Sequence, residues 1–136
     1  MQIIKGIDHF VLVTQNLSEC LRFYRDLLGL EVKEQKGTNS EGKSVARYAL
    51  HLGAQKINIH QSFGEFSPSA SASCVGALDF CLLAEGDIEQ IKQNLQAKGA
   101  EILLGVVERT GAHSKLNSIY LKDPDGNLVE IAVEKS

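Results

Sequence analysis

The sequence repeats itself at a spacing of about 70 residues, and this repeat limits the possible folds more than any other feature. Each half follows the order strand, helix, strand, strand, strand. Apolar residues of the first strands and glycines after the helices recur in register: the matched pairs are Gly6 and Gly76, Phe10 and Phe80, Leu12 and Leu82, and Gly29 and Gly99. The repeat predicts an α+β fold of two βαβββ modules, residues 1–60 and 76–136, fused into a single domain with a pseudo-two-fold axis.

Local patterns predict the elements of each module. Module 1 is expected to contain a strand at 6–14, a helix capped by Asn16 and stopped by Gly29, a strand at 30–35, a polar loop at 36–43, and strands at 44–52 and 56–60. Module 2 is expected to contain a strand at 76–83, a helix capped by Asp87 and stopped by Gly99, a strand at 102–107, a loop at 108–114, and a closing hairpin that turns at 123–127.

A connector at 61–75 joins the two modules. It is rich in Ser, Gly and Ala, and it starts directly after His60. A connector of this length inside a small domain indicates a linker or a lid over a site. We expect a mobile lid or wall, in which Phe63 and Phe66 close over a bound substrate as apolar anchors.

Four residues that can bind a metal or a proton fall on matching positions of the repeat. His9 aligns with Asp79, and His60 aligns with Glu130 at the same spacing. Side chains alternate along a strand, so each of these residues points away from the bulky apolar face of its strand. A curved sheet with helices on its convex side would bring all four to its concave side, which we call the cup.

Composition excludes several other functions. The net charge is −3 and no block of Lys and Arg occurs, which argues against nucleic acid or an anionic membrane as partner. No apolar run is long enough to cross a bilayer, and the start of the chain lacks the pattern of a signal peptide. Cys20, Cys74 and Cys81 are odd in number and show no metal-binding spacing. We expect a cytoplasmic protein.

These motifs resemble the vicinal oxygen chelate superfamily, which includes glyoxalase I, bleomycin and fosfomycin resistance proteins, methylmalonyl-CoA epimerase and extradiol dioxygenases. The resemblance covers the whole chain and rests on the segments 7–13, 23–30 and 120–131. Within the superfamily, the segments 58–66, 109–112 and 118–120 look like the subgroup called glyoxalase domain-containing protein 5.

The resemblance implies a cupped sheet with a divalent metal, whose ligands come from the first and fourth strands of each module. Carried over by position, the ligands are His9, His60, Asp79 and Glu130. The order of nitrogen and carboxylate ligands departs from that of glyoxalase I, where the second and third ligands are Glu and His. Fe²⁺, Mn²⁺, Ni²⁺ and Zn²⁺ all suit a set of two His and one carboxylate. Asp79 is a fourth ligand, an orienting partner of a ligand, a general base, or simply a strand-end carboxylate that makes backbone hydrogen bonds, and Glu130 is the other catalytic candidate.

Further residues are candidates for substrate binding. Arg47 lies in a strand and can project into the cup to hold an anionic group, although a solvated strand-edge Arg fits the pattern equally well. Arg109 and Lys115 flank a loop expected beside the mouth of the cup, and Tyr120 can donate a proton to an oxyanion or simply pack in the core.

Two functions remain open. The first is a metalloenzyme that stabilises an enediolate or alkoxide of a small oxygen-chelating substrate, as a lyase, isomerase, transferase or dioxygenase. The second is a metal-free protein that binds a small molecule or drug, like the bleomycin resistance proteins. In either case apolar strands and open sheet edges predict a homodimer.

Overall fold

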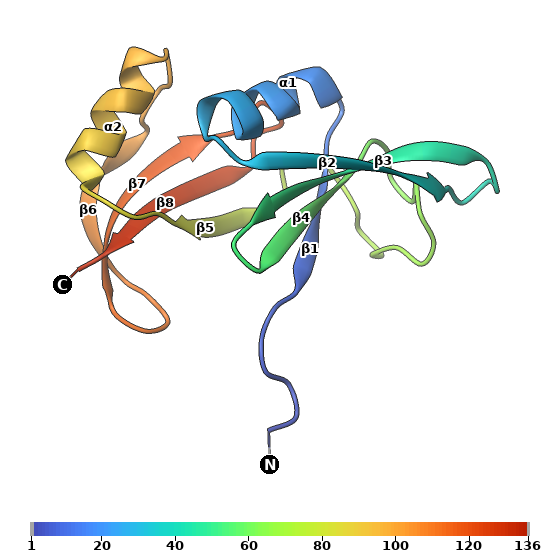
Figure 1. The fold of residues 1–136 in the computed structure, drawn as a ribbon, viewed down its shortest axis with the longest axis horizontal. Coiled ribbons are helices and arrows are strands. Elements are labelled where there is room, and N and C mark those ends of the chain that lie inside the picture. Colours follow the sequence, from blue (N-terminus) through green and yellow to red (C-terminus); the bar gives the residue numbers. More distant parts are fainter. Residues whose placement is uncertain (1, 136) are drawn as a thin grey trace. The chain divides into compact units, whose positions relative to one another are not determined.

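The computed structural model describes residues 2–135 and divides the chain into two compact units. Unit 1 ends at Val75 and unit 2 begins at Gly76. Each unit contains one four-stranded mixed sheet and one helical segment, and Figure 1 traces both along the chain. The predicted α+β class with two βαβββ modules is confirmed.

Unit 1 has the strand order β1-β4-β3-β2. Its elements are β1 His9–Val13, the helix α1 Leu17–Leu21, the π-helical turn η1 Arg22–Leu27 that continues α1, β2 Glu31–Thr38, β3 Ser44–Leu52 and β4 Gln55–His60. β1 and β4 are parallel, whereas the other two pairs are antiparallel. The helix begins at its predicted cap, where Asn16 Oδ1 accepts a hydrogen bond from the Glu19 N–H, and Gly29 follows it with a φ of 80°.

Unit 2 repeats this order as β5-β8-β7-β6. Its elements are β5 Asp79–Leu83, α2 Ile88–Ala97, β6 Leu104–Thr110, β7 Lys115–Lys122 and β8 Leu128–Glu134. Asp87 caps α2 by accepting a hydrogen bond from the Glu89 N–H at 2.9 Å, as predicted. Because both units pair their first and last strands in parallel, the two sheets can be compared position by position.

One face of each sheet is apolar and buried. In unit 1 it carries Leu12, Leu50, Ile57 and Ile59, which are all at most 2% exposed. In unit 2 the same face carries Ile119, Leu121, Val129 and Ile131. Side chains of the helices are buried as well: Cys20, Phe23 and Tyr24 in unit 1, and Ile88 and Leu95 in unit 2. The opposite face of each sheet, the open face, therefore carries the polar residues.

The turn between β7 and β8 is held by a buried cluster of polar side chains. Asp123 accepts hydrogen bonds from the backbone N–H groups of Asp125 and Asn127 and from the Asn127 side chain. Asn127 Oδ1 in turn accepts a hydrogen bond from the Leu78 N–H at 3.0 Å. Asn127 is only 1% exposed, so this turn ties the start of β5 to the start of β8.

Several predicted boundaries are wrong. β1 starts at His9 and β5 at Asp79, because the residues before them are not paired with residues of the neighbouring strand. β2 continues to Thr38 and pairs with Ser44, which shortens the predicted loop at 36–43. β6 runs to Thr110, so Arg109 lies in a strand rather than in the predicted loop at 108–114. Within residues 2–135, no helix has the length and apolar character needed to span a membrane.

Candidate functional site

The open face of unit 1 holds a cavity of about 540 Å³. Its wall comes from all four strands: His9, Lys33, Glu34, Gln35, Arg47, Tyr48, Ala49, His51, Lys56 and Asn58. Most of these residues share a face by strand register. His9 and Arg47 thus line the same cavity of unit 1.

Arg47 is held in place from two sides. A methyl group at Gly37, on the neighbouring strand β2, would lie 2.1 Å from Arg47 Cδ, so the side chain crosses the space that this glycine leaves free. Its guanidinium carbon lies 4.1 Å from the centroid of the Phe66 ring. Cation–π contact of this kind stabilises a guanidinium and fixes its plane.

His60 does not lie in the cavity wall. Its side chain is 8% exposed, and its ring packs edge-on against Phe66 with a centroid distance of 4.9 Å. Burial lowers the pKa of His60 below its ordinary value; the charge of Glu65 opposes this effect, and that of Arg47 adds to it. His60 is thus a largely neutral ring in an aromatic stack with Phe66.

The start of the connector is attached to unit 1. The Gln61 N–H donates to Glu65 Oε1 at 2.7 Å, and the Ser40 N–H donates to the Glu65 carbonyl at 2.7 Å. Phe66 is 7% exposed, so its ring is already buried and cannot serve as the predicted free anchor over a substrate. Phe63, at 64% exposure, remains available. Residues 61–66 are therefore attached to unit 1 through Glu65 and the buried ring of Phe66.

His9 and Asn58 are the two residues of β1 and β4 that line the cavity and can donate to a metal. His9 Nδ1 lies 2.8 Å from Asp8 Oδ2, so Nε2 is the nitrogen that remains for a ligand. Asn58 lies opposite Val11 in the parallel pair and is half-buried. Asn58 was not selected from the sequence, because amides are weaker ligand signals than His or carboxylates.

The open face of unit 2 carries a row of four residues across its strands. Register places Cys81, Glu130, Tyr120 and Leu104 side by side on β5, β8, β7 and β6. Cys81 forms a side-chain hydrogen bond with Glu130. Partial burial, followed by the charge and the hydrogen bond of Glu130, raises the pKa of Cys81 to about 11. The Cys81 thiol is therefore protonated at neutral pH and donates to the carboxylate.

Tyr120 is joined to Arg109 on β6. Arg109 Nε donates to the Tyr120 hydroxyl at 2.9 Å, and its guanidinium carbon lies 5.4 Å from the ring centroid. Lys115, at the far end of the hairpin, donates instead to Thr110 Oγ1 at 2.9 Å. The structure thus joins Arg109, Tyr120 and Glu130 on one face, whereas Lys115 has a separate partner.

Strand register corrects one of the two predicted pairs. His9 and Asp79 are equivalent, because each opens its strand and faces the first paired residue of the partner strand. Glu130, however, lies opposite Cys81, and the residue opposite the equivalent Val11 is Asn58. His60 lies opposite Val13 and corresponds to Ala132. The constant spacing fails because the chain from β1 to β4 is two residues shorter than that from β5 to β8.

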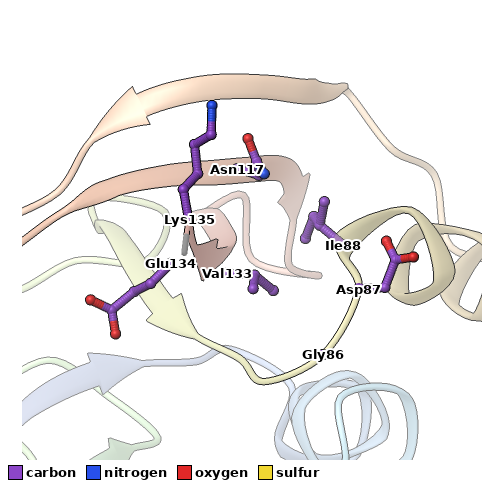
Figure 2. A pocket seen from close by; sticks show the side chains of 7 residues that line it. All are labelled: Gly86, Asp87, Ile88, Asn117, Val133, Glu134 and Lys135. Carbon is purple, nitrogen blue, oxygen red and sulfur yellow. The ribbon is translucent and has the colours of Figure 1, made fainter.

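A second cavity, of about 370 Å³, lies in unit 2 (Figure 2). Asp87 and Ile88 at the start of α2 face Asn117, Val133 and Lys135 across it. It contains none of the residues selected from the sequence. Its lining offers no cluster of ligand groups, so we place the candidate site on the open faces.

The side chains that could donate to a metal are divided between the two units. Within either unit, the described residues gather no three His, Cys, Asp or Glu side chains that could hold a metal. Unit 1 offers His9 and Asn58, and unit 2 offers Asp79 and Glu130.

Known proteins resemble this chain in both sequence and fold. Residues 6–131 match the family described as Glyoxalase/Bleomycin resistance protein/Dioxygenase superfamily. The virulence protein STM3117 of Salmonella typhimurium is 42% identical over 130 residues, which are 96% of this chain and 85% of that protein. The glyoxalase domain-containing protein RDO1 of Mycosarcoma maydis is 34% identical over 129 residues, 95% of this chain and 68% of that protein.

The crystal structure of STM3117 agrees with the fold described above. It superposes with a TM-score of 0.83 at 40% identity, covering 98% of this chain and 100% of the other. The repeated βαβββ order, the polar open faces and the match over residues 6–131 all agree. The chain therefore belongs to the glyoxalase/bleomycin resistance protein/dioxygenase superfamily, also called the vicinal oxygen chelate superfamily.

Proposed function

We propose that this protein is a metal-dependent enzyme that acts on a small substrate with adjacent oxygen atoms. The observation that carries the proposal is the pairing of Glu130 with a thiol donor and a tyrosine on the open face of unit 2. A half-buried carboxylate that accepts a hydrogen bond from Cys81 and lies beside Tyr120 is suited to accept and return a proton. A purely structural role would not require this grouping.

The proposed metal is a divalent ion such as Mn²⁺, Fe²⁺, Ni²⁺ or Zn²⁺. Its ligands in the proposal are His9, Asp79 and Glu130, with a fourth donor from β4. Sequence spacing selects His60 for this place, whereas strand register selects Asn58. When bound, the ion would supply Lewis-acid stabilisation of negative charge on substrate oxygen.

Proton transfer, oxyanion stabilisation and substrate binding fall to residues of this chain. Glu130 and Asp79 are the candidate proton carriers, and Cys81 keeps the Glu130 carboxylate oriented through its hydrogen bond. Tyr120, whose hydroxyl accepts a hydrogen bond from Arg109, retains its own O–H to donate to a developing oxyanion. In unit 1, Arg47 binds the part of the substrate that does not react.

A metal-free binding protein is the second candidate. The cavity of unit 1 favours it, because its polar wall can hold a ligand without any metal. In that case the protein would sequester a small molecule, and Glu130 would have no catalytic role.

Hydrogen exchange into substrate separates these candidates. Tag-free protein loaded in turn with Mn²⁺, Fe²⁺, Ni²⁺ or Zn²⁺ would be mixed with panels of 2-hydroxy acids, 2-oxo acids and catechols in D₂O and followed by NMR. We expect deuterium uptake or product formation with at least one pair, lowered about 100-fold or more in Glu130→Gln. Binding without turnover for every metal, equal in the wild type and in Glu130→Gln, would support the second candidate.

We also propose that the protein is a homodimer. Apolar side chains remain exposed at Ile3, Ile4 and Ile7, before β1, and at Leu83 at the end of β5. A second copy of the chain could cover such residues. Light scattering at several concentrations should give twice the chain mass of 14.8 kDa, and a mass of 14.8 kDa throughout would contradict the proposal.

A further inference from the structure

We infer that the cavity of unit 1 selects substrates with an anionic head group, a carboxylate or a phosphate, and that Arg47 determines this specificity. The inference deepens the proposed function, on which it rests, by naming the class of substrate. Its evidence is independent of any metal, since it comes from the contacts and charges of the cavity wall alone.

Arg47 is preorganised for an anion. The space beside Gly37 admits its aliphatic stem, and the ring of Phe66 supports the guanidinium at 4.1 Å. A guanidinium held in one plane presents paired N–H donors that match the two oxygens of a carboxylate or phosphate. Because the side chain is already ordered, little conformational entropy is lost when the anion binds.

No carboxylate within residues 2–135 pairs with Arg47. The ion pairs of the described residues involve other cations, and the contacts of the Arg47 guanidinium are aromatic. A half-buried arginine without an acidic partner in its own unit is a ready receptor for an external anion. Arg47 does act on the largely neutral ring of His60, whose pKa it lowers, and Glu65 acts on the same ring in the opposite direction.

The remaining wall of the cavity is cationic and polar. Lys33 and Lys56 add to the charge of Arg47, and Glu34 is the only acid in the lining. Glu34 is engaged by the Tyr48 hydroxyl, whose pKa it raises by accepting the hydrogen bond. Glu31, which does not line the cavity, lies 3.5 Å from Lys33 Nζ. Both side chains are exposed, so solvent weakens this ion pair and Lys33 can still attract an anion.

The cavity has the size of a small metabolite. A volume of about 540 Å³ falls within the range of small-molecule sites. Ala49 and Asn58 form its floor, opposite each other on β3 and β4, and their short side chains leave the space open. The Asn58 amide can orient the uncharged part of the ligand while Arg47 holds the head group.

The test uses the full chain without metal, in the presence of EDTA. ¹⁵N-labelled protein would be titrated separately with inorganic phosphate and with glycolate, and the Arg47 Nε–H signal and backbone amides would be followed by NMR. We expect saturable shifts at Arg47, Ala49 and Asn58. Saturation by phosphate alone or by glycolate alone would each support the inference and identify which anion the site prefers.

Matched variants make the test specific. Arg47→Lys keeps the charge but loses the planar donors, and we expect affinity to fall about tenfold. The affinity of Gly37→Ala should fall by a similar factor, because the added methyl group displaces the aliphatic stem of Arg47. Arg22→Gln, which removes an exposed arginine paired with Glu19, is the charge control and should change affinity by less than about twofold.

The inference is overturned if neither anion gives saturable shifts in the cavity, or if Arg47→Lys and Arg22→Gln bind equally well. Failure of the proposed enzyme function has a different signature, namely anion binding that depends on Arg47 without any turnover after metal is added. The two failures can therefore be told apart.

Discussion

The two units share one topology but use their open faces differently. Across the middle of unit 1, register aligns Val11, Asn58 and Ala49. The equivalent row in unit 2 is Cys81, Glu130 and Tyr120. Unit 1 therefore has small residues where unit 2 has reactive ones, and the small residues leave room for a cavity.

This difference shows what duplication of a sheet preserves and what it leaves free. Backbone hydrogen bonding fixes strand order and register, so both units retain the same positions on the same face. Side-chain size and charge at those positions can then diverge without cost to the ladder. Under the proposed function, unit 1 would supply the substrate cavity and unit 2 the proton-carrying residues.

The largest predicted effect concerns one hydrogen bond in each unit, which links the start of its last strand to the segment before its first strand. We call this hydrogen bond the clasp. Asn127 Oδ1 accepts from the Leu78 N–H at 3.0 Å, and at the equivalent position Gln55 Nε2 donates to the Ile7 carbonyl at 2.9 Å. Asn127 is buried and Gln55 is exposed. Asn127→Ala should lower the unfolding free energy by about 3 kcal/mol, because buried partners lose their hydrogen bonds.

Gln55→Ala is the matched control and should lower the unfolding free energy by about 0.5 kcal/mol or less. Urea unfolding of both variants measures the difference. Equal losses in the two variants would show that burial does not distinguish the two clasps.

The second prediction compares two exposed thiols, one in each unit. Because the pKa of Cys81 is raised to about 11, a smaller fraction of this thiol is ionised than of an ordinary cysteine. At pH 8, alkylation of Cys81 by iodoacetamide should be about 100-fold slower than that of Cys74, the exposed cysteine of unit 1. Cys74 in unit 1 provides the internal reference.

Glu130→Gln should accelerate alkylation of Cys81 and leave Cys74 unchanged, which mass spectrometry of peptides can measure. If both thiols react at equal rates in the wild-type protein, the hydrogen bond to Glu130 does not operate in solution.

The smallest effect concerns His60, the buried histidine of unit 1. Its folded-state pKa is lowered by burial, so the unfolded chain binds a proton first as the pH falls. The stabilisation that neutral His60 gives to the folded state is therefore complete at pH values above its ordinary pKa of 6.5, and it is lost as the pH drops below that value. Unfolding free energies at pH 7.5 and 5.5 should differ less in His60→Gln than in the wild type.

His113→Gln, in the exposed loop of unit 2, is the control variant, which removes a histidine outside the buried stack. A His60 ring that titrates in NMR at or above 6.5 would contradict the prediction.

The fold could be predicted because local signals and the repeat agree. Asn16, Asp87, Gly29 and Gly99 mark the helix ends in sequence and in structure. Strand ends were harder, since Thr38 and Arg109 are polar and become strand residues only through pairing with β3 and β7. Pairing between distant segments leaves no trace in a local pattern.

The acidic residues of the candidate site could be predicted more completely than its basic residues. Glu130 stands out as a carboxylate among apolar residues. The equivalence of His60 with Glu130 failed because a fixed spacing ignores a two-residue difference between the modules. The support of Arg47 by Gly37 and Phe66 could not be predicted, because it joins three segments in space.

Calorimetric titration of the tag-free protein tests whether the chain binds a divalent metal. Calorimetric titration with Mn²⁺ would compare the wild type with Glu130→Gln, Asn58→Ala and His60→Gln, with Arg22→Gln as control. We expect binding of about one ion per chain, weakened about tenfold or more by Glu130→Gln and by Asn58→Ala, and changed less than about twofold by His60→Gln. Loss of binding in His60→Gln with Asn58→Ala unaffected would contradict the register argument, and a wild-type chain that binds none of Mn²⁺, Fe²⁺, Ni²⁺ or Zn²⁺ would contradict the proposed metalloenzyme.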